Sequence, residues 1–260
     1  LYRKKSGTVA DKQAIASYVD KAFIVQSLDD NFNVRRVERF MVQIMEENIS
    51  SVLVLNKADL DFDRQSVEEQ IKHISSQIPV FFTSIHQLET IVRLRKSISE
   101  GETVVFVGSS GVGKSSLVNA LCEKPVLLTS DISLSTGKGR HTSTRREMVL
   151  MDSSGVLIDT PGVREFGLAI DNPDSLAEVL EISDYAELCR FKDCKHINEP
   201  GCAVIEAVNS GALDSKVYES YLKLRREAWH FSASEHEKRK KEKSFTKFVE
   251  EVKNRKDANR

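Results

Sequence analysis

Two short motifs occur in an unusual order, and that order limits what the chain can fold into. Gly-Ser-Ser-Gly-Val-Gly-Lys-Ser at residues 108–115 has the pattern of a phosphate-binding loop between a strand and a helix. Asn-Lys-Ala-Asp at residues 56–59 has the pattern of a guanine-reading tetrapeptide, which ordinarily follows such a loop but here precedes it. Asp-Thr-Pro-Gly at residues 159–162 is a third motif that GTP sites contain. The order predicts a circularly permuted P-loop GTPase domain.

Composition narrows the class of protein further. The chain has 260 residues, of which 40% are hydrophobic and 30% charged, enough for one good core and a second, smaller one. The apolar runs are too short to span a bilayer, and the first residues do not form a signal peptide. We therefore expect a cytoplasmic protein that does not enter a membrane. Because the first residue is Leu, we also expect that an N-terminal part of the protein is missing.

The spacing of apolar residues predicts an α/β fold. Short apolar runs alternate with helical patterns through the first two thirds of the chain, which is typical of a mainly parallel sheet with helices on both faces. The expected strands lie at residues 22–25, 52–55, 80–82, 103–107, 147–151 and 156–158. The expected helices carry apolar stripes within residues 34–45, 67–74 and 88–98, which we expect to belong to the core.

The remaining segments do not show this alternation of strand and helix patterns. Residues 127–146 are rich in Ser, Thr, Gly and basic side chains, and we expect them to form a loop. After about residue 168 the pattern becomes helical. We therefore divide the chain into a remnant of a preceding domain at residues 1–13, the permuted GTPase domain at 14–168 and a small, mostly helical domain at 169–260.

The phosphate-binding loop contains the residues that its chemistry requires. Its glycines let backbone amides approach the phosphates, and the helix that begins at Lys114 adds its positive end. We expect Lys114 to contact the terminal phosphates, Ser115 to ligate magnesium and Ser116 to reach the α-phosphate. A chance glycine-rich turn would not explain the flanking strand and helix patterns. The expected phosphate contacts are Gly108, Ser109, Ser110, Gly111, Val112, Gly113, Lys114, Ser115 and Ser116.

Base recognition is expected after a neighbouring strand. Ionised Asp59 can accept two hydrogen bonds from guanine, whereas adenine would leave the carboxylate unpaired at a cost of about 1–3 kcal/mol. We expect Asn56 to brace the phosphate loop and Lys57 to lie over the base. A surface turn is the alternative reading of this four-letter motif. The expected base contacts are Asn56, Lys57, Ala58, Asp59, Thr83 and Ser84.

The segment after the last expected strand should sense the γ-phosphate. We expect Asp159 to reach magnesium through water and the Gly162 amide to face the γ-phosphate. The next residue is Val163, where Ras-like enzymes have a glutamine that orients water. Because a valine side chain cannot orient water, another polar group must do so.

The loop around residues 139–144 offers that group. His141 could order or deprotonate the attacking water, and Thr142 or Thr144 could ligate magnesium in the GTP state. From these residues alone, a solvent-facing loop histidine is an equally good reading of His141.

Three cysteines and a histidine have the spacing of a metal site. Three thiolates and one imidazole fill a tetrahedral zinc shell and leave no position for water, which predicts a structural site. A catalytic metal would need an open position, and disulfides would leave an odd cysteine. Cys122 is expected to be a small buried hydrophobe. The expected zinc ligands are Cys189, Cys194, His196 and Cys202, which makes residues 169–260 a zinc-binding domain.

These motifs, in this order and with Arg-His-Thr-Ser-Thr at residues 140–144, closely resemble the ribosome small subunit-dependent GTPase A family, RsgA, also called YjeQ. The resemblance runs from about residue 14 to the C-terminal helix. It implies a permuted GTPase that acts in late maturation of the 30S subunit and is stimulated by that subunit. It also implies that His141 is catalytic and that the cysteine cluster binds zinc. The family normally has an N-terminal OB-fold, of which at most residues 1–7 would be present here.

The end of the chain is basic. The formal net charge is −1, yet residues 236–260 contain ten Lys or Arg against five Asp or Glu. We expect RNA phosphate contacts there, although a solvated helical face is the commoner role of such a run. The expected contacts are Lys238, Arg239, Lys240 and Lys241.

The expected partners are GTP or GDP, the 30S subunit and 16S rRNA, and we expect a monomer. Two rival readings differ in chemistry. One is an rRNA-binding assembly scaffold in which GTP is a ligand with little turnover, and the other is an ATP-dependent kinase or ATPase that shares the phosphate loop.

Overall fold

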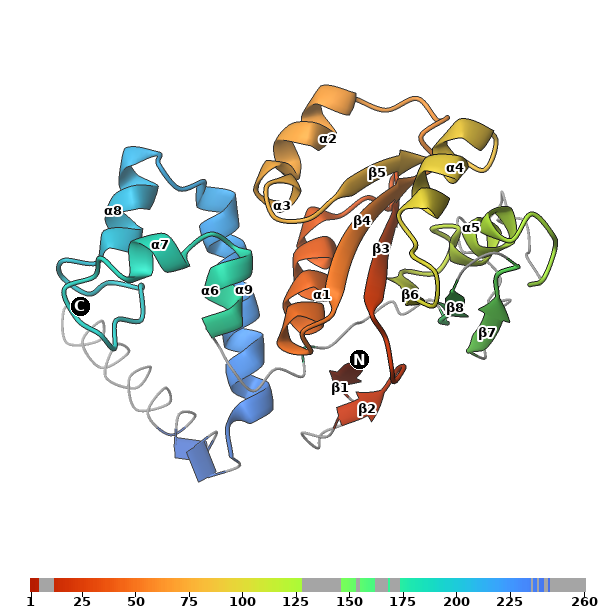
Figure 1. The fold of residues 1–260 in the computed structure, drawn as a ribbon. Helices are drawn as coiled ribbons and strands as arrows, with labels where there is room; N and C mark the ends of the chain where they lie inside the picture. The colour runs from red at the N-terminus through yellow and green to blue at the C-terminus, as the bar shows by residue number, and fades with distance from the viewer. Residues whose placement is uncertain are drawn as a thin grey trace, which may run out of the picture.

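A computed structural model describes residues 1–4, 12–127, 146–152, 155–161, 168, 174–234, 236, 237, 239, 240 and 243. Its centre is a six-stranded sheet with the order β5-β4-β3-β6-β8-β7, in which only β7 is antiparallel to its neighbour (Figure 1). The strands are β3 Lys21–Ser27, β4 Ser50–Asn56, β5 Val80–Thr83, β6 Thr103–Gly108, β7 Glu147–Leu150 and β8 Val156–Asp159. All six predicted strands are confirmed. A separate antiparallel pair is formed by β1 Tyr2–Lys4 and β2 Lys12–Ala14.

The central strands are apolar because helices cover both faces of the sheet. One face packs against α1 Val34–Glu46, α2 Arg64–Gln70 and α3 Lys72–Ser75, and the other against α4 Leu88–Lys96 and α5 Lys114–Leu121. Within the second face, Phe23 and Phe106 of adjacent strands meet edge to face with ring centroids 5.3 Å apart. The predicted mainly parallel α/β fold is therefore confirmed.

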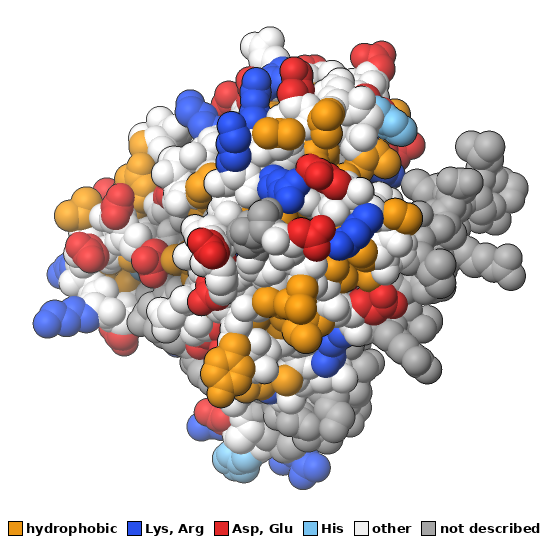
Figure 2. All heavy atoms as spheres, turned by 45° about the vertical axis from the view of Figure 1, so that its right-hand side comes forward, with side chains coloured by type: hydrophobic (Ala, Val, Ile, Leu, Met, Phe, Trp, Pro, Cys, Tyr) orange, Lys and Arg blue, Asp and Glu red, His pale blue; other side chains and the backbone are white. Residues whose placement is uncertain are grey.

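Two helical expectations need correction. The stripe at residues 67–74 belongs to two helices, because the backbone leaves helical geometry at Ile71, between α2 and α3. The stripe at residues 88–98 is only partly core: Ile91 and Leu94 are buried, whereas Leu88 is 70% exposed and Val92 is exposed as well. A short helix on one sheet face can bury only the positions that point to that face. Figure 2 shows the side that carries α4, with hydrophobic side chains exposed among charged ones.

The chain beyond the sheet is helical, as its sequence predicts. It forms α6 Asp174–Val179, α7 Ser183–Ala186, α8 Ala203–Ser210 and α9 Ser215–Ser232. α6 and α9 lie beside α1, and their apolar side chains join the core on that face of the sheet (Figure 1). The α9 helix begins where the side chain of Asp214 accepts a hydrogen bond from the Lys216 amide at 2.7 Å.

Polar contacts also hold this helical region against α1. Arg35 pairs with Glu219 at 3.3 Å, Arg39 pairs with Glu227 at 2.6 Å, and the Ser175 hydroxyl donates to Glu46 at 3.0 Å. The other carboxylate oxygen of Glu227 accepts from the buried Leu168 amide at 3.3 Å. In the described part of the chain, every helix is too short or too polar to cross a bilayer.

Candidate functional site

The predicted motifs meet at one edge of the sheet. The carboxyl ends of parallel strands share an edge, and open α/β sheets bind ligands there. The β3 strand pairs with both β4 and β6, so that Ser27 is opposite Asn56 and Val25 is opposite Gly108. Only one strand therefore separates the tetrapeptide from the phosphate loop, although about fifty residues separate them in sequence. Asp159 ends β8, on the other side of β6.

A buried asparagine joins the two motifs directly. The Asn56 side-chain amide donates to the Val112 carbonyl at 2.9 Å, and its oxygen accepts from the Thr83 hydroxyl at 3.3 Å. Gly113 has φ 93°, and a Cβ there would lie 2.3 Å from the amide nitrogen of Asn56. The residue at position 113 must therefore be glycine for the loop to sit this close to β4.

Lys114 is buried inside the phosphate loop. Its side chain is only 6% exposed, and the ammonium donates to the carbonyls of Gly108 at 3.1 Å and Ser109 at 2.9 Å. Burial lowers the pKa of Lys114 to about 8, and the nearby Asp159 carboxylate opposes that shift. A phosphate group bound in the loop would favour the protonated, charged form of Lys114.

Ser115 and Asp159 form an oxygen-rich pair beside the loop. The Ser115 hydroxyl donates to Asp159 at 2.5 Å, and the Asp159 side chain is 2% exposed. Burial raises the pKa of this carboxyl, and its second oxygen has no hydrogen-bond partner among the described residues. Hard oxygen donors of this kind are what Mg²⁺ prefers, so the residues present fit a magnesium ion.

The base-reading side of the site includes Asp59, Ser84 and Lys57. Asp59 is exposed, and a hydrogen bond from the Ser84 hydroxyl holds the pKa of its carboxyl below the ordinary range. The Ala58 amide donates to the Thr83 carbonyl at 2.9 Å, which ties the tetrapeptide to β5. Lys57 has φ 61°, and its ammonium pairs with Asp29 at 2.7 Å. The ionised Asp59 is thus available to accept hydrogen bonds.

Asp29 is a site residue that the sequence analysis missed. It follows β3 and accepts from Lys57 with one oxygen and from the Ser27 hydroxyl at 2.7 Å and the Asn31 amide at 3.0 Å with the other. Burial alone would raise the pKa of Asp29, but the hydrogen bonds from Lys57 and Ser27 hold it below its ordinary value. Its position directly after an apolar strand, at the same sheet edge as the motifs, was the available signal.

Several predicted residues lie outside the described part of the chain. They are His141, Thr142, Thr144, Gly162, Val163, Lys238 and Lys241. The predictions for them therefore remain predictions.

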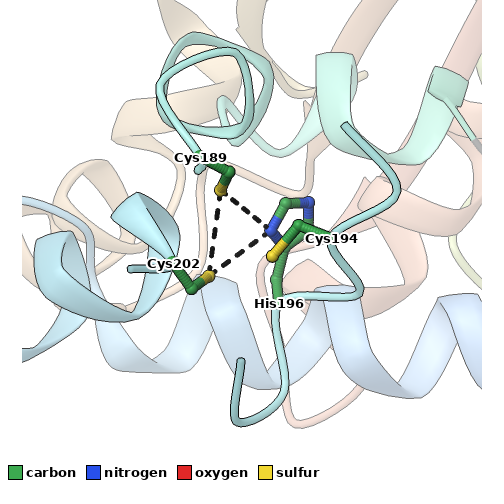
Figure 3. A group of neighbouring side chains, drawn as sticks. All are labelled: Cys189, Cys194, His196 and Cys202. Atoms are coloured by element: carbon green, nitrogen blue, oxygen red, sulfur yellow. Dashed lines mark hydrogen bonds between the residues drawn. The ribbon is translucent and has the colours of Figure 1, made fainter. Parts of the chain in front are cut away.

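The predicted metal ligands meet in the helical region. The sulfurs of Cys189 and Cys202 each lie 3.5 Å from Nδ1 of His196 and 3.9 Å from each other (Figure 3). With Cys194, all four ligand atoms lie within 4.8 Å of one another, so the group could hold a metal ion. Burial raises the pKa of the Cys202 thiol to about 11 and lowers the pKa of His196.

Contacts besides these four side chains also hold the loop that carries the cluster. The Glu199 carboxylate accepts from the backbone amides of Lys195, Ile197 and Asn198 at 3.1, 2.9 and 3.2 Å, and these bonds lower its pKa to about 2. The Tyr218 hydroxyl of α9 donates to the His196 carbonyl at 2.6 Å. These contacts hold the backbone on both sides of His196.

Comparison with known proteins gives a consistent result. The family model for the RsgA GTPase matches residues 1–169. A model for ABC transporters matches residues 91–258, a range that includes the phosphate loop, which unrelated nucleotide-binding families share, but excludes residues 56–59. The two models overlap at residues 91–169, which contain the loop.

Individual relatives agree with the first model. A small ribosomal subunit biogenesis GTPase RsgA 1 of Bacteroides thetaiotaomicron is 83% identical over 98% of this chain and 72% of its own length. An RsgA 2 of Vibrio parahaemolyticus is 39% identical over 96% and 70%. The crystal structure of YjeQ from Thermotoga maritima matches with a TM-score of 0.62 and 28% identity over 81% and 71%. YloQ, described as a circularly permuted GTPase, matches with a TM-score of 0.61 and 27% identity over 81% and 68%.

Proposed function

This chain belongs to the RsgA GTPase family, and on that premise we propose that it hydrolyses GTP while it acts on a maturing small ribosomal subunit. The observation that carries the proposal is the hydrogen bond from Asn56 to Val112, which joins the guanine motif to the phosphate loop despite their reversed order. The reaction is the transfer of the γ-phosphoryl group to water, in which positioning and charge neutralisation supply most of the catalysis.

We propose that Asp59 reads the guanine and that Asp29 holds Lys57 in place beside it. Lys114 and the loop amides bind the phosphates, with Ser116 reaching the α-phosphate and the Gly162 amide facing the γ-phosphate. Ser115, Asp159 and either Thr142 or Thr144 hold magnesium, which neutralises charge on the phosphate oxygens when it is bound.

His141 is the proposed water-ordering residue. The residue after Gly162 is Val163, which has no polar group for this task. A histidine can accept a proton near neutral pH, because its ordinary pKa is close to 6.5. Since His141 is part of a loop sequence, contact with the ribosomal subunit can place it, which explains why the subunit would accelerate hydrolysis.

The metal in the cysteine cluster is proposed to be zinc. Three thiolates and one imidazole suit zinc, and a filled shell makes the site structural. We further propose that residues 14–168 form the GTPase domain and residues 169–260 the zinc-binding domain. The protein is proposed to act in the cytoplasm as a monomer, with 16S rRNA as part of its binding surface.

The test is GTP turnover by the wild type and by His141→Ala, with and without purified 30S subunits. We expect the subunits to accelerate the wild type, and the variant to lose about 100-fold or more of that turnover with unchanged GDP affinity. His236→Ala, a histidine in the basic tail, is the matched control and should behave as the wild type. Absence of any acceleration by 30S subunits would favour the scaffold reading instead.

A further inference from the structure

A groove lies between α1 and α9, away from both sites described above. It has a volume of about 270 Å³. Four basic side chains and one carboxylate line it, together with the asparagine that caps α1: Arg35, Arg36, Arg39, Lys223, Glu38 and Asn33. The residues are contributed by two helices that belong to different parts of the chain, so the groove exists only when the helical region sits against the sheet.

The basic side chains are not equally neutralised. Arg35 pairs with Glu219, Arg39 pairs with Glu227, and Lys223 lies 3.8 Å from Glu219. Arg36 donates only to the backbone carbonyl and side-chain oxygen of Asn31, at 3.1 and 3.2 Å. Within the described part of the chain, Arg36 thus contacts neutral oxygens and its charge lacks a carboxylate partner.

Two further polar atoms at the groove lack hydrogen-bond partners. Among the described residues, the buried Nε of Arg39 has no acceptor and Oε2 of Glu38 has no donor. Glu38 is 1% exposed, and its other oxygen is bonded to Nε2 of His73 at 3.0 Å. A ligand that satisfies these atoms would offer acceptors to the arginines and one donor to Glu38.

The positive end of α1 also faces this region. Asn33 caps α1, and the first turn of this 13-residue helix contains no acidic residue. The N-terminus of a helix favours a nearby anion. The positive end of α1 and the charge of Arg36 therefore both favour an anion in the groove.

We propose that this groove binds the sugar-phosphate backbone of RNA, with the phosphate on Arg36, Arg39 and Lys223 and a ribose hydroxyl on Glu38. The phosphate oxygens supply acceptors and the 2′-hydroxyl supplies the donor, a combination that DNA lacks. The proposal deepens the proposed function, because it rests on an RNA partner and assigns a new surface to it.

The groove is linked to the guanine motif by a chain of contacts. Arg36 donates to Asn31, the Asn31 amide donates to Asp29, and Asp29 pairs with Lys57. A phosphate that draws Arg36 away from Asn31 would loosen the residue that holds Lys57. We therefore expect RNA in the groove to change the affinity for GDP, and GDP to change the affinity for RNA by the same factor.

The test measures binding of a short RNA, and of DNA of the same sequence, to the full chain with GDP bound over a series of salt concentrations. For Arg36→Gln combined with Lys223→Gln we expect about 10-fold weaker RNA binding and a salt slope smaller by roughly 1, because two of the three side chains that neutralise the phosphate lose their charge. Lys216→Gln, on the exposed side of α9, is the control and should match the wild type. Equal RNA binding by the double variant and the control overturns the proposal.

Two further measurements fix the source of the phosphate and the role of Glu38. The wild type should prefer RNA to DNA, and equal affinities would overturn the ribose contact. Inorganic phosphate should compete with RNA in the wild type but not in the double variant; if it binds in a variant-sensitive way while RNA binding is unaffected, the groove is a site for free phosphate and not for RNA.

The same samples separate this proposal from the proposed function. GTP turnover without RNA is measured with Lys223→Gln alone and should equal that of the wild type, because Lys223 pairs with Glu219 on its own helix and not with the residues between Arg36 and Lys57. If the wild type turns over GTP but the double variant binds RNA as tightly as the wild type, only the groove proposal fails. If the wild type shows no turnover even with 30S subunits, the proposed function fails, whatever the RNA measurements give.

Discussion

The sheet region and the helical region position their sites by different means. In the sheet region, the ends of β3, β4, β6 and β8 set the site, and two apolar clusters fix those strands. In the helical region, α6, α7 and α8 have only 6, 4 and 8 residues. Helices this short are marginal by themselves. The comparison predicts that the strand ends keep Asn56, Gly108 and Asp159 in place without a ligand, whereas the short helices around the cysteine cluster depend more on a bound metal.

Removal of the metal should give the largest difference between the two regions. Zinc contributes about 10–16 kcal/mol to the folding of small zinc modules, far more than α6, α7 and α8 can replace. We expect Cys202→Ser, or a strong chelator, to abolish amide protection in α7 and α8. Hydrogen exchange followed by mass spectrometry measures this region by region.

Cys122→Ser is the matched control, because Cys122 is outside the cluster. The strands of the sheet should keep their protection in both variants, and GDP affinity should remain within a few-fold of the wild type. Loss of protection throughout the sheet in Cys202→Ser would contradict the separation between the regions.

The second effect tests how the sheet region holds its loop. Gly113→Ala places a methyl group against Asn56, so we expect a loss of about 2–3 kcal/mol in GDP binding from strain and the displaced asparagine. Gly111→Ala has a similar positive φ, 82°, but a Cβ there meets nothing within 4 Å. Its loss should be about 1 kcal/mol. Titration calorimetry compares the two, and equal losses would mean that the contact with Asn56 is unimportant.

A third prediction concerns pH. The pKa of Lys114 is about 8 in the free protein, and bound phosphates would keep the amine protonated. Above pH 8, binding must therefore take up a proton, and GDP affinity should fall by about 1.4 kcal/mol per pH unit. Measurements between roughly pH 7 and 9 should show this loss in the wild type but not in Lys114→Arg, whose guanidinium stays charged.

The stability of the nucleotide-free protein should change in the opposite direction. The folded pKa of Lys114 is lower than the value of 10.5 in the unfolded chain. Between about pH 8 and 10.5 the unfolded state binds more protons, so this residue makes the protein more stable as pH rises. Below pH 8 the lysine is charged in both states, and that stabilisation is absent. Urea unfolding at several pH values checks the sign.

The smallest effect concerns the join between the regions. The side chains of Arg39 and Glu227 are about one-third exposed, so their coupling should be about 0.2–1 kcal/mol. A double-mutant cycle with Arg39→Met and Glu227→Gln, followed by urea unfolding, measures it. Arg64 and Glu68 form a more exposed pair within α2 and serve as the comparison. If the pair across the regions couples no more strongly, apolar contacts alone join them.

Much of this molecule could be predicted from sequence because the relevant signals are local. All six strands follow from short apolar runs, and the positions of Asn56, Gly108 and Asp159 at strand ends bring them to one edge once the sheet is parallel. The cluster around His196 follows from ligand spacing.

Features that depend on tertiary partners were missed. The pair of Lys57 with Asp29 joins residues 28 positions apart, and no periodic pattern indicates such a contact. The exposure of Leu88 depends on which positions of α4 reach the sheet, and periodicity alone does not give this. The groove between α1 and α9 requires two helices that are distant in sequence to lie side by side.

The contacts of the Glu227 carboxylate place Leu168 close to the part of α9 that carries a fluorescent side chain. One of its oxygens accepts from Arg39, and the other from the amide of Leu168, which follows the segment that starts at Asp159. Trp229, the only tryptophan of the chain, is two residues further along α9 and meets the ring of His230 edge to face. If a change of nucleotide displaces Leu168, the intrinsic fluorescence of Trp229 should therefore change, and no label needs to be attached.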